Sequence, residues 1–206
     1  LYTQYKENRE SPPEDLIPQF ALIRELVDAM DIPVLLAPGF EADDVLATLA
    51  KRAEQAGLPV VVVSADKDLM QLVNDRIALF DPMKDRTIDR APVIERFGVP
   101  PENVVDLLGL AGDSSDNIPG VPRVGPKTAA ALIRAHGDVE HVIRALAAAG
   151  TRKSVEQSVV DHQDSARLSR TLAMLREDAP VTLDLRALAY TQPDPEKLGT
   201  FLAKIE

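Results

Sequence analysis

Four consecutive valines at residues 60–63 constrain the fold of this chain more than any other stretch. A run of β-branched residues favours an extended strand, and a strand that is apolar on both faces is typical of the centre of a parallel sheet. Parallel strands need long crossover connections, which are usually helices. We therefore expect an α/β fold in which this strand lies centrally in a parallel sheet.

Helix and strand patterns alternate around the valine run. Apolar residues recur at spacings of four and three over residues 16–30, which predicts an amphipathic helix with Asp15 as its N-cap. The other predicted elements are a strand over 32–37, a helix over 42–55, a short helix over 66–73 and a strand over 77–80. This alternation implies right-handed crossovers and a doubly wound sheet.

Beyond about residue 90 the pattern becomes helical, with no clear strand. Helices are predicted over residues 92–97, 102–111, 126–135, 139–148, about 155–176 and 195–204, while residues 183–190 are ambiguous. We therefore divide the chain into an α/β part, residues 1–90, and a helical part, residues 91–206.

The composition limits the metal sites and partners that are possible. The chain has no cysteine, and its three histidines lack metal-site spacing, so a metal would sit on oxygen ligands, which suits Mg²⁺ or Mn²⁺. A net charge of −10 argues against nucleic-acid binding unless the acids bind cations. No apolar stretch reaches the ~20 residues that span a bilayer. The start at Leu1 reads like part of a longer protein.

Seven carboxylates fall into three clusters, each beside an apolar run: Glu41, Asp43 and Asp44; Asp66 and Asp68; Asp113 and Asp116. The first two clusters follow predicted strands, at the sheet edge where open α/β proteins bind ligands. Five carboxylates in one crevice would repel one another, and a divalent cation would relieve that repulsion. Helix capping is the alternative for the first two clusters, and a simple turn is the alternative for the third.

A glycine turn, defined as residues 118–128 (IPGVPRVGPKT), precedes a predicted helix. Pro126 suits the first helical position. Free backbone N–H groups at that helix start can hold a phosphate, and Lys127 adds positive charge. The glycine turn lacks the Walker spacing, and a plain connection between two helices is the alternative.

Three segments carry a family resemblance: EADDVLATLA, VVVSADKDLMQLV and FGVPPENVVDLLGLAGDSSDNIPGVPRVGPKTAAALI. They closely resemble the 5′-nuclease domain of bacterial DNA polymerase I, which belongs to the flap endonuclease family. LYTQYKENR and RLSRTLAMLREDAPVTLDL extend the resemblance to both ends of the chain. It implies a PIN-like parallel sheet with flanking helices, an arch remnant in residues 1–31, and a helix–three-turn–helix motif at about 102–136.

The resemblance also implies a two-metal 5′–3′ exonuclease or 5′-flap endonuclease of DNA replication and repair, using Mg²⁺ or Mn²⁺. All seven carboxylates would then bind metal, and the catalytic set would be Lys6, Glu41, Asp43, Asp44, Asp66 and Asp68. Lys6 would polarise the scissile phosphate, Tyr5 would stack on a base, and Arg9 would contact phosphate. The DNA-binding residues of the glycine turn would be Gly120, Val121, Arg123, Gly125, Lys127 and Thr128, with K⁺ between the turn and the phosphate.

By the same resemblance, the protein would be bacterial, cytoplasmic and nucleoid-associated. It would act as a monomer on DNA 5′ ends, flaps or nicks, with a polymerase following it in the parent protein. Family members carry two further metal-site aspartates on strands that would precede Leu1. We therefore expect an N-terminally truncated chain with impaired cleavage. The alternatives are a structure-specific DNA-binding fragment, an acidic Mg²⁺- or Ca²⁺-dependent interaction domain without nucleic acid, and a PIN-type ribonuclease.

Overall fold

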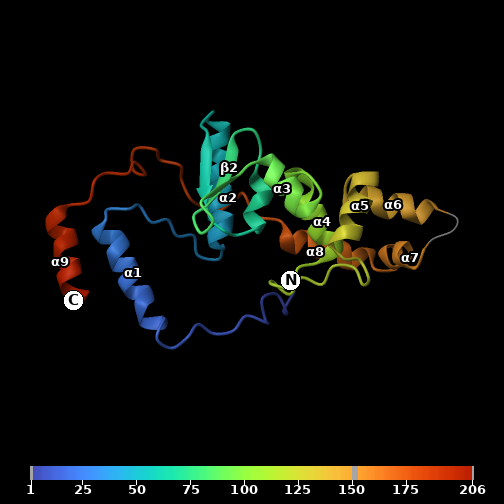
Figure 1. Ribbon diagram of the computed structural model, residues 1–206, viewed down its shortest axis with the longest axis horizontal. Coiled ribbons are helices and arrows are strands. Elements are labelled where there is room, and N and C mark those ends of the chain that lie inside the picture. Colours follow the sequence, from blue (N-terminus) through green and yellow to red (C-terminus); the bar gives the residue numbers. More distant parts are fainter. Residues whose placement is uncertain (1, 150–152, 206) are drawn as a thin grey trace.

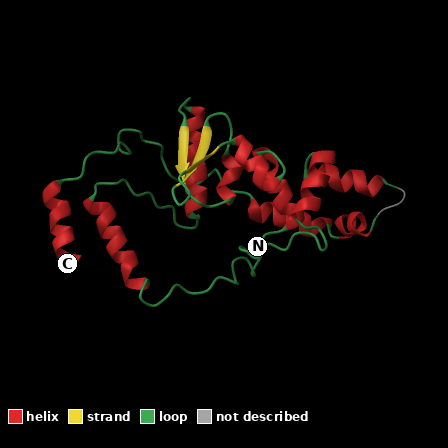
Figure 2. Cartoon of the chain, in the orientation of Figure 1, coloured by secondary structure: helices red, strands yellow, loops and turns green. Residues whose placement is uncertain are grey.

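The computed structural model describes residues 2–149 and 153–205 (Figure 1). Its strands are β1 (Val60–Val63), β2 (Ile77–Asp81) and β3 (Arg86–Ile88). Its α-helices are α1 (Ile17–Ala29), α2 (Ala42–Gln55), α3 (Arg90–Phe97), α4 (Val104–Ala111), α5 (Pro126–His136), α6 (Val139–Ala148), α7 (Ser154–Asp161), α8 (Gln163–Ala173) and α9 (Pro195–Ile205). Short 3₁₀ helices are η1 (Asp68–Leu72) and η2 (Pro101–Asn103). The sheet lies between a helical part on one side and the pair α1 and α9 on the other (Figure 2).

The sheet has the order β1-β2-β3, so the valine run lies at an edge and its predicted central position is wrong. β1 is parallel to β2, while β3, which was not predicted from the sequence, is antiparallel to β2. Val62 is buried, but Val61 and Val63 are 62% and 64% exposed. Four valines look the same in sequence whether one face of the strand or both are covered, and here only one is.

The strand predicted over residues 32–37 is also wrong, because this segment has no regular secondary structure. Val34 and Leu36 are 41% and 66% exposed. An apolar run becomes a strand only where a neighbouring strand pairs with its backbone groups. Among the described residues, β1 pairs only with β2.

Helix ends differ from expectation at two places. α1 begins after Leu16, which makes no side-chain cap, so Asp15 is not the N-cap. Pro18 does fall in the first turn of α1, where its missing N–H costs no hydrogen bond. The helix predicted over 155–176 is broken at His162 into α7 and α8, because the His162 backbone leaves the helical conformation at φ −116°.

α4 is the centre of the helical part, with Val104, Leu107 and Leu110 at most 1% exposed. It packs against α5 and α8. One hydrophobic core continues from Val62 and Ile77 of the sheet into these helices. The sheet and the helical part are thus packed against each other without an intervening linker.

α1 and α9 pack on each other, away from this core (Figure 1). Phe201 is buried, while Lys197 and Lys204 of α9 form ion pairs with Asp31 and Glu25. No described helix is long and apolar enough to cross a membrane.

Candidate active site and nucleic-acid interface

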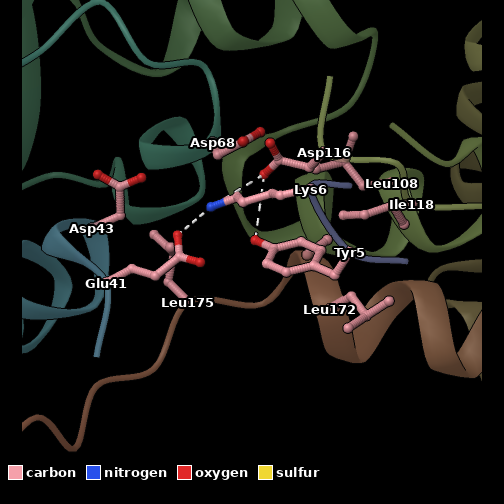
Figure 3. A pocket seen from close by; sticks show the side chains of 11 residues that line it. Tyr5, Lys6, Glu41, Asp43, Asp68, Leu108, Asp116, Ile118, Leu172 and Leu175 are labelled. Carbon is pink, nitrogen blue, oxygen red and sulfur yellow. Dashed lines mark hydrogen bonds and ion pairs between the residues drawn. The ribbon is translucent and has the colours of Figure 1, made fainter. Parts of the chain in front are cut away.

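A carboxylate pocket, with a cavity volume of about 30 Å³, opens where five parts of the chain meet (Figure 3). Its polar lining residues are Tyr5, Lys6, Glu41, Asp43, Asp68 and Asp116. Its apolar lining residues are Leu108, Ile118, Leu172, Ala173 and Leu175. The fold therefore brings four of the seven predicted carboxylates together with two of the predicted N-terminal residues.

Local hydrogen bonds explain how the acids reach this pocket. The backbone N–H of Glu41 donates to the Asp44 carboxylate at 3.1 Å in a capping box, which starts α2 and leaves Asp43 in its first turn. The Asp68 N–H donates to Asp66 Oδ1 at 2.9 Å, a short-range turn that leads into η1. Helix capping, the alternative explanation for this cluster, thus accounts for Asp44. Glu41 and Asp43 of the same cluster line the pocket.

The N-terminal segment lies across the pocket. Lys6 adopts φ +58°, its N–H donates to the Asp116 carbonyl oxygen at 3.0 Å, and its ammonium forms an ion pair with Glu41. Arg9 forms an ion pair with Asp116 at 2.6 Å, and the Tyr5 hydroxyl lies 3.4 Å from the same carboxylate. The structure therefore places Tyr5, Lys6 and Arg9 beside the acidic groups.

Burial and like charges set the ionisation of the pocket. Burial raises the pKa of Asp68 to about 6; Asp66 adds to this, while Lys67 opposes it. Burial also raises the pKa of Asp43, again with a contribution from Asp66. Burial alone would lower the pKa of Lys6, but its hydrogen bonds to Glu41 and Tyr5 outweigh that, so the pKa is raised.

The other three predicted carboxylates do not line the pocket. Both oxygens of Asp44 accept backbone N–H groups, one from Glu41 and one from Arg176 at 2.9 Å. Asp113 binds Lys67 and Ser115; burial raises its pKa, but these hydrogen bonds outweigh the burial and lower it. Asp66 accepts the Asp68 N–H.

Within residues 2–149 and 153–205, no three acidic or histidine side chains are gathered into a group that could hold a metal ion. The donor chemistry nevertheless fits a hard divalent cation, because the pocket offers oxygen ligands from four carboxylates and the Tyr5 hydroxyl. Asp43 and Asp68, whose pKa values are raised in this acidic setting, are the groups whose ionisation a cation would favour.

The glycine turn follows directly after the pocket, and Ile118 belongs to both. Gly120 has φ +63°, and a Cβ there would lie 2.3 Å from the Gly112 nitrogen. No described residue accepts a hydrogen bond from the turn's outer amides, those of Arg123, Gly125, Lys127 and Thr128. Because α5 begins at Pro126, the free N–H groups of Gly125, Lys127 and Thr128 lie at a helix start, where backbone amides can hold a phosphate.

Two residues at the site were missed in the sequence. Lys67 forms ion pairs with Asp68, at 3.4 Å, and with Asp113. Its position between two aspartates was the available signal. The Gln71 amide donates to the carbonyl oxygens of Asp68, at 2.9 Å, and of Ala173, at 3.0 Å. No sequence pattern marks that contact between η1 and the end of α8.

Two family models match this chain. The model described as 5′-3′ exonuclease, N-terminal resolvase-like domain, matches residues 1–98, and the model described as 5′-3′ exonuclease, C-terminal SAM fold, matches residues 99–196. The chain belongs to the 5′-3′ exonuclease family. The resemblance drawn from the acidic segments and the glycine turn is thereby confirmed, as is an α/β part followed by a helical part.

Curated relatives agree with this family assignment. The chain is 48% identical to DNA polymerase I of Rhizobium leguminosarum over 206 residues, and 40% identical to that of Thermus aquaticus over 205. It spans 20% and 24% of the lengths of these two relatives. It is 36% identical to the 5′-3′ exonuclease of Aquifex aeolicus, spanning 70% of that protein.

Solved structures share the fold. A zinc-bound T5 5′-exonuclease matches with a TM-score of 0.72 at 24% identity, over 98% of this chain and 76% of that one. The catalytic core of Rad2 in complex with DNA matches with a TM-score of 0.60 at 18% identity, over 96% of this chain and 66% of that one.

Proposed function

We propose that this 5′-3′ exonuclease family chain carries the active centre and DNA grip of a divalent-metal-dependent 5′–3′ exonuclease or 5′-flap endonuclease of DNA replication and repair. The observation that carries the proposal is the convergence of Lys6, Glu41, Asp43, Asp68 and Asp116 in one pocket that adjoins the glycine turn. Family membership supplies the reaction class. The pocket supplies groups suited to phosphodiester hydrolysis.

In this proposal, two Mg²⁺ or Mn²⁺ ions are held by Glu41, Asp43, Asp44, Asp66, Asp68, Asp113 and Asp116. When bound, such ions supply activation of water and neutralisation of phosphate charge. Asp44 and Asp113 are already hydrogen-bonded to other groups of the chain. Glu41, Asp43, Asp68 and Asp116 line one pocket, so they are the first ligands to test.

The N-terminal residues orient and neutralise the substrate. The Lys6 ammonium reaches the middle of the carboxylate pocket (Figure 3), where it would face a scissile phosphate. Such a fixed positive charge stabilises negative charge that develops in the transition state. Tyr5 would stack on an adjacent base, and Arg9 would contact a neighbouring phosphate.

In this proposal, the glycine turn binds the DNA backbone. Its residues Gly120, Val121, Arg123, Gly125, Lys127 and Thr128 are proposed to hold one phosphate, with K⁺ as a further cation. Backbone amides read phosphate and not bases, so recognition would follow DNA structure and not sequence. The substrates would be DNA 5′ ends, flaps and nicks.

The rest of the proposal concerns the setting of the chain. We divide it at about residue 90 into a nuclease part and a DNA-binding part, with the helix–three-turn–helix at about 102–136. We propose a monomer in the bacterial cytoplasm, associated with the nucleoid and followed by a polymerase in the parent protein. High identity to several DNA polymerase I sequences supports this setting.

Mg²⁺-dependent cleavage of a labelled 5′-flap duplex tests the reaction. We expect EDTA to abolish cleavage by the chain, whatever its rate, and Lys6→Ala to lower kcat about a hundredfold, as for loss of one transition-state donor. Lys84→Ala is the control, since the Lys84 side chain is 68% exposed and outside the pocket. Equal cleavage by Lys6→Ala and the control would contradict the role given to Lys6.

A second candidate is structure-specific DNA binding with impaired cleavage. It is favoured by the ion pairs that Glu41 and Asp116 make with Lys6 and Arg9, and by the lack of a gathered three-ligand group within the described residues. Flap binding in EDTA without cleavage in Mg²⁺ supports this candidate over the first. A chain that neither binds nor cleaves flap DNA contradicts both.

A further inference from the structure

Three serines of α7 and α8 hydrogen-bond to the inner side of the glycine turn. The Ser165 hydroxyl donates to the Gly120 carbonyl oxygen at 2.6 Å, and the Gly120 N–H donates to Ser169 Oγ at 2.9 Å. The Ser158 hydroxyl donates to the Pro122 carbonyl oxygen at 2.7 Å. We name these three residues the serine support.

These bonds differ from what helical hydroxyls usually do. A serine or threonine inside a helix commonly donates to the carbonyl four residues earlier in the same helix. Thr171, also on α8, does this with Arg167 at 2.9 Å. Ser165 and Ser169 are four residues apart, so they share one face of α8, and that face meets the glycine turn.

The serine support acts on the most constrained point of the turn. Gly120 has φ +63°, and a Cβ there would come within 2.3 Å of the Gly112 nitrogen, so the turn approaches the end of α4 too closely for any side chain at this position. Ser169 is 0% exposed and Ser158 is 8% exposed, so water cannot readily replace these hydroxyls. The Val121 N–H is satisfied separately, by the Leu110 carbonyl oxygen at 2.8 Å.

The inner backbone groups of the turn are therefore satisfied, while its outer amides are free. The outer amides belong to Arg123, Gly125, Lys127 and Thr128, and none has an acceptor among the described residues. An anion site made of backbone amides binds tightly only if those amides are held in place before the anion arrives. The serine support provides that restraint.

α8 also connects the turn to the carboxylate pocket. Leu172 and Ala173, at its C-terminal end, line the pocket, and Ser165 and Ser169 hold the turn. One rigid helix therefore contacts both parts of the proposed site.

We propose that Ser158, Ser165 and Ser169 are positioning residues that preset the glycine turn for the DNA backbone. This inference rests on the proposed function of the turn. It adds that the serine support, on α7 and α8, determines how tightly the turn binds DNA, although these residues touch neither DNA nor the carboxylate pocket.

Two measurements on the full chain test this inference. The first is the Kd for a fluorescein-labelled 5′-flap duplex in EDTA, well below the melting temperature of every variant. The Ser165→Ala/Ser169→Ala variant should bind about tenfold more weakly, as expected when a buried backbone group loses its partner. Thr171→Ala, the control on the same helix, should bind like the wild type. Ser165→Thr keeps a hydroxyl and should bind more tightly than Ser165→Ala.

The second measurement is amide hydrogen exchange of Gly120, which needs no DNA. It should be about tenfold faster in Ser169→Ala, with α4 and α6 unchanged. A double variant whose Kd lies within about twofold of the wild-type Kd would overturn the inference. So would a Gly120 exchange rate that is unchanged in Ser169→Ala. If the wild type itself does not bind the duplex, the proposed function fails, and the exchange result alone decides the positioning role. If the double variant does not fold, Ser165→Ala alone is tested in the same two ways.

Discussion

At the scale of single residues, Gly120 is the position where the backbone least tolerates a side chain. Replacement by alanine would combine a left-handed backbone with a Cβ 2.3 Å from the Gly112 nitrogen. We expect Gly120→Ala to lower the free energy of unfolding by about 3 kcal/mol. Gly125→Ala, in the same turn but with open space around it and φ −87°, should cost less than about 1 kcal/mol. Urea denaturation of both variants checks this, and equal losses would contradict it.

Asp68 gives a prediction about pH. Burial raises its folded-state pKa from 3.8 to about 6, so the folded chain binds a proton that the unfolded chain has already released. Stability from this group is therefore present at low pH and is lost as the pH rises from about 4 to about 6. At pH 7 without metal, Asp68→Asn should be more stable than wild type by about 1–2 kcal/mol, after allowance for solvent screening.

Denaturation at pH 4 and pH 7 in EDTA measures this effect. At pH 4 the difference between Asp68→Asn and wild type should nearly vanish. Asp164→Asn, whose side chain is 97% exposed, serves as the control and should change neither value. A difference between Asp68→Asn and wild type that is equal at both pH values would show that charge at Asp68 is not the cause.

At the scale of elements, one buried carboxylate joins three helices. Asp106 of α4 is 3% exposed and accepts from Arg170 Nε of α8 at 2.7 Å and from the Val139 N–H of α6 at 3.3 Å. Asp106→Ala would leave a buried N–H without its acceptor and Arg170 without its ion-pair partner. We expect a loss of about 3 kcal/mol in the free energy of unfolding.

The matched control for Asp106 is the exposed pair of Arg167 and Asp164, 3.3 Å apart on α8. Asp164→Ala should cost less than about 0.5 kcal/mol, because exposed ion pairs contribute little. Chemical denaturation compares the two variants. Similar losses would mean that burial of Asp106 does not determine its contribution.

At the scale of the whole molecule, α1 and α9 form a unit outside the main hydrophobic core (Figure 1). Ile17, Phe20 and Ile23 of α1 are each more than half exposed. Because few apolar groups are buried there, this pair should open locally at a lower free energy than the core helices. Hydrogen exchange should show α1 and α9 exchanging together, and faster than α4 and α8.

Phe201→Ala sharpens this prediction, because Phe201 is the buried side chain of α9. It should speed exchange in both α1 and α9 while leaving α4 unchanged. Faster exchange in α9 alone would show that the two helices do not open as one unit.

Short-range sequence signals determine much of the local structure of this protein. The bounds of α2 and α6 follow from apolar periodicity and helix-end residues, and both match the predicted ranges. The residues of the glycine turn follow from the backbone needs of glycine and proline. These signals act within a few residues, so the sequence alone carries them.

Only the tertiary structure decided how distant segments meet. Segment 32–37 has strand composition but pairs with no strand in the part of the chain that the structure describes, and only one face of the valine run is covered. Neither segment therefore adopts its predicted place in the sheet. Glu41, Asp43, Asp68 and Asp116 line the pocket, whereas Asp44 and Asp113 bond to Arg176 and Lys67. The physical reason is that a carboxylate's role depends on which donors lie within hydrogen-bond distance. Those donors come from segments whose positions are fixed by packing around α4 and α8.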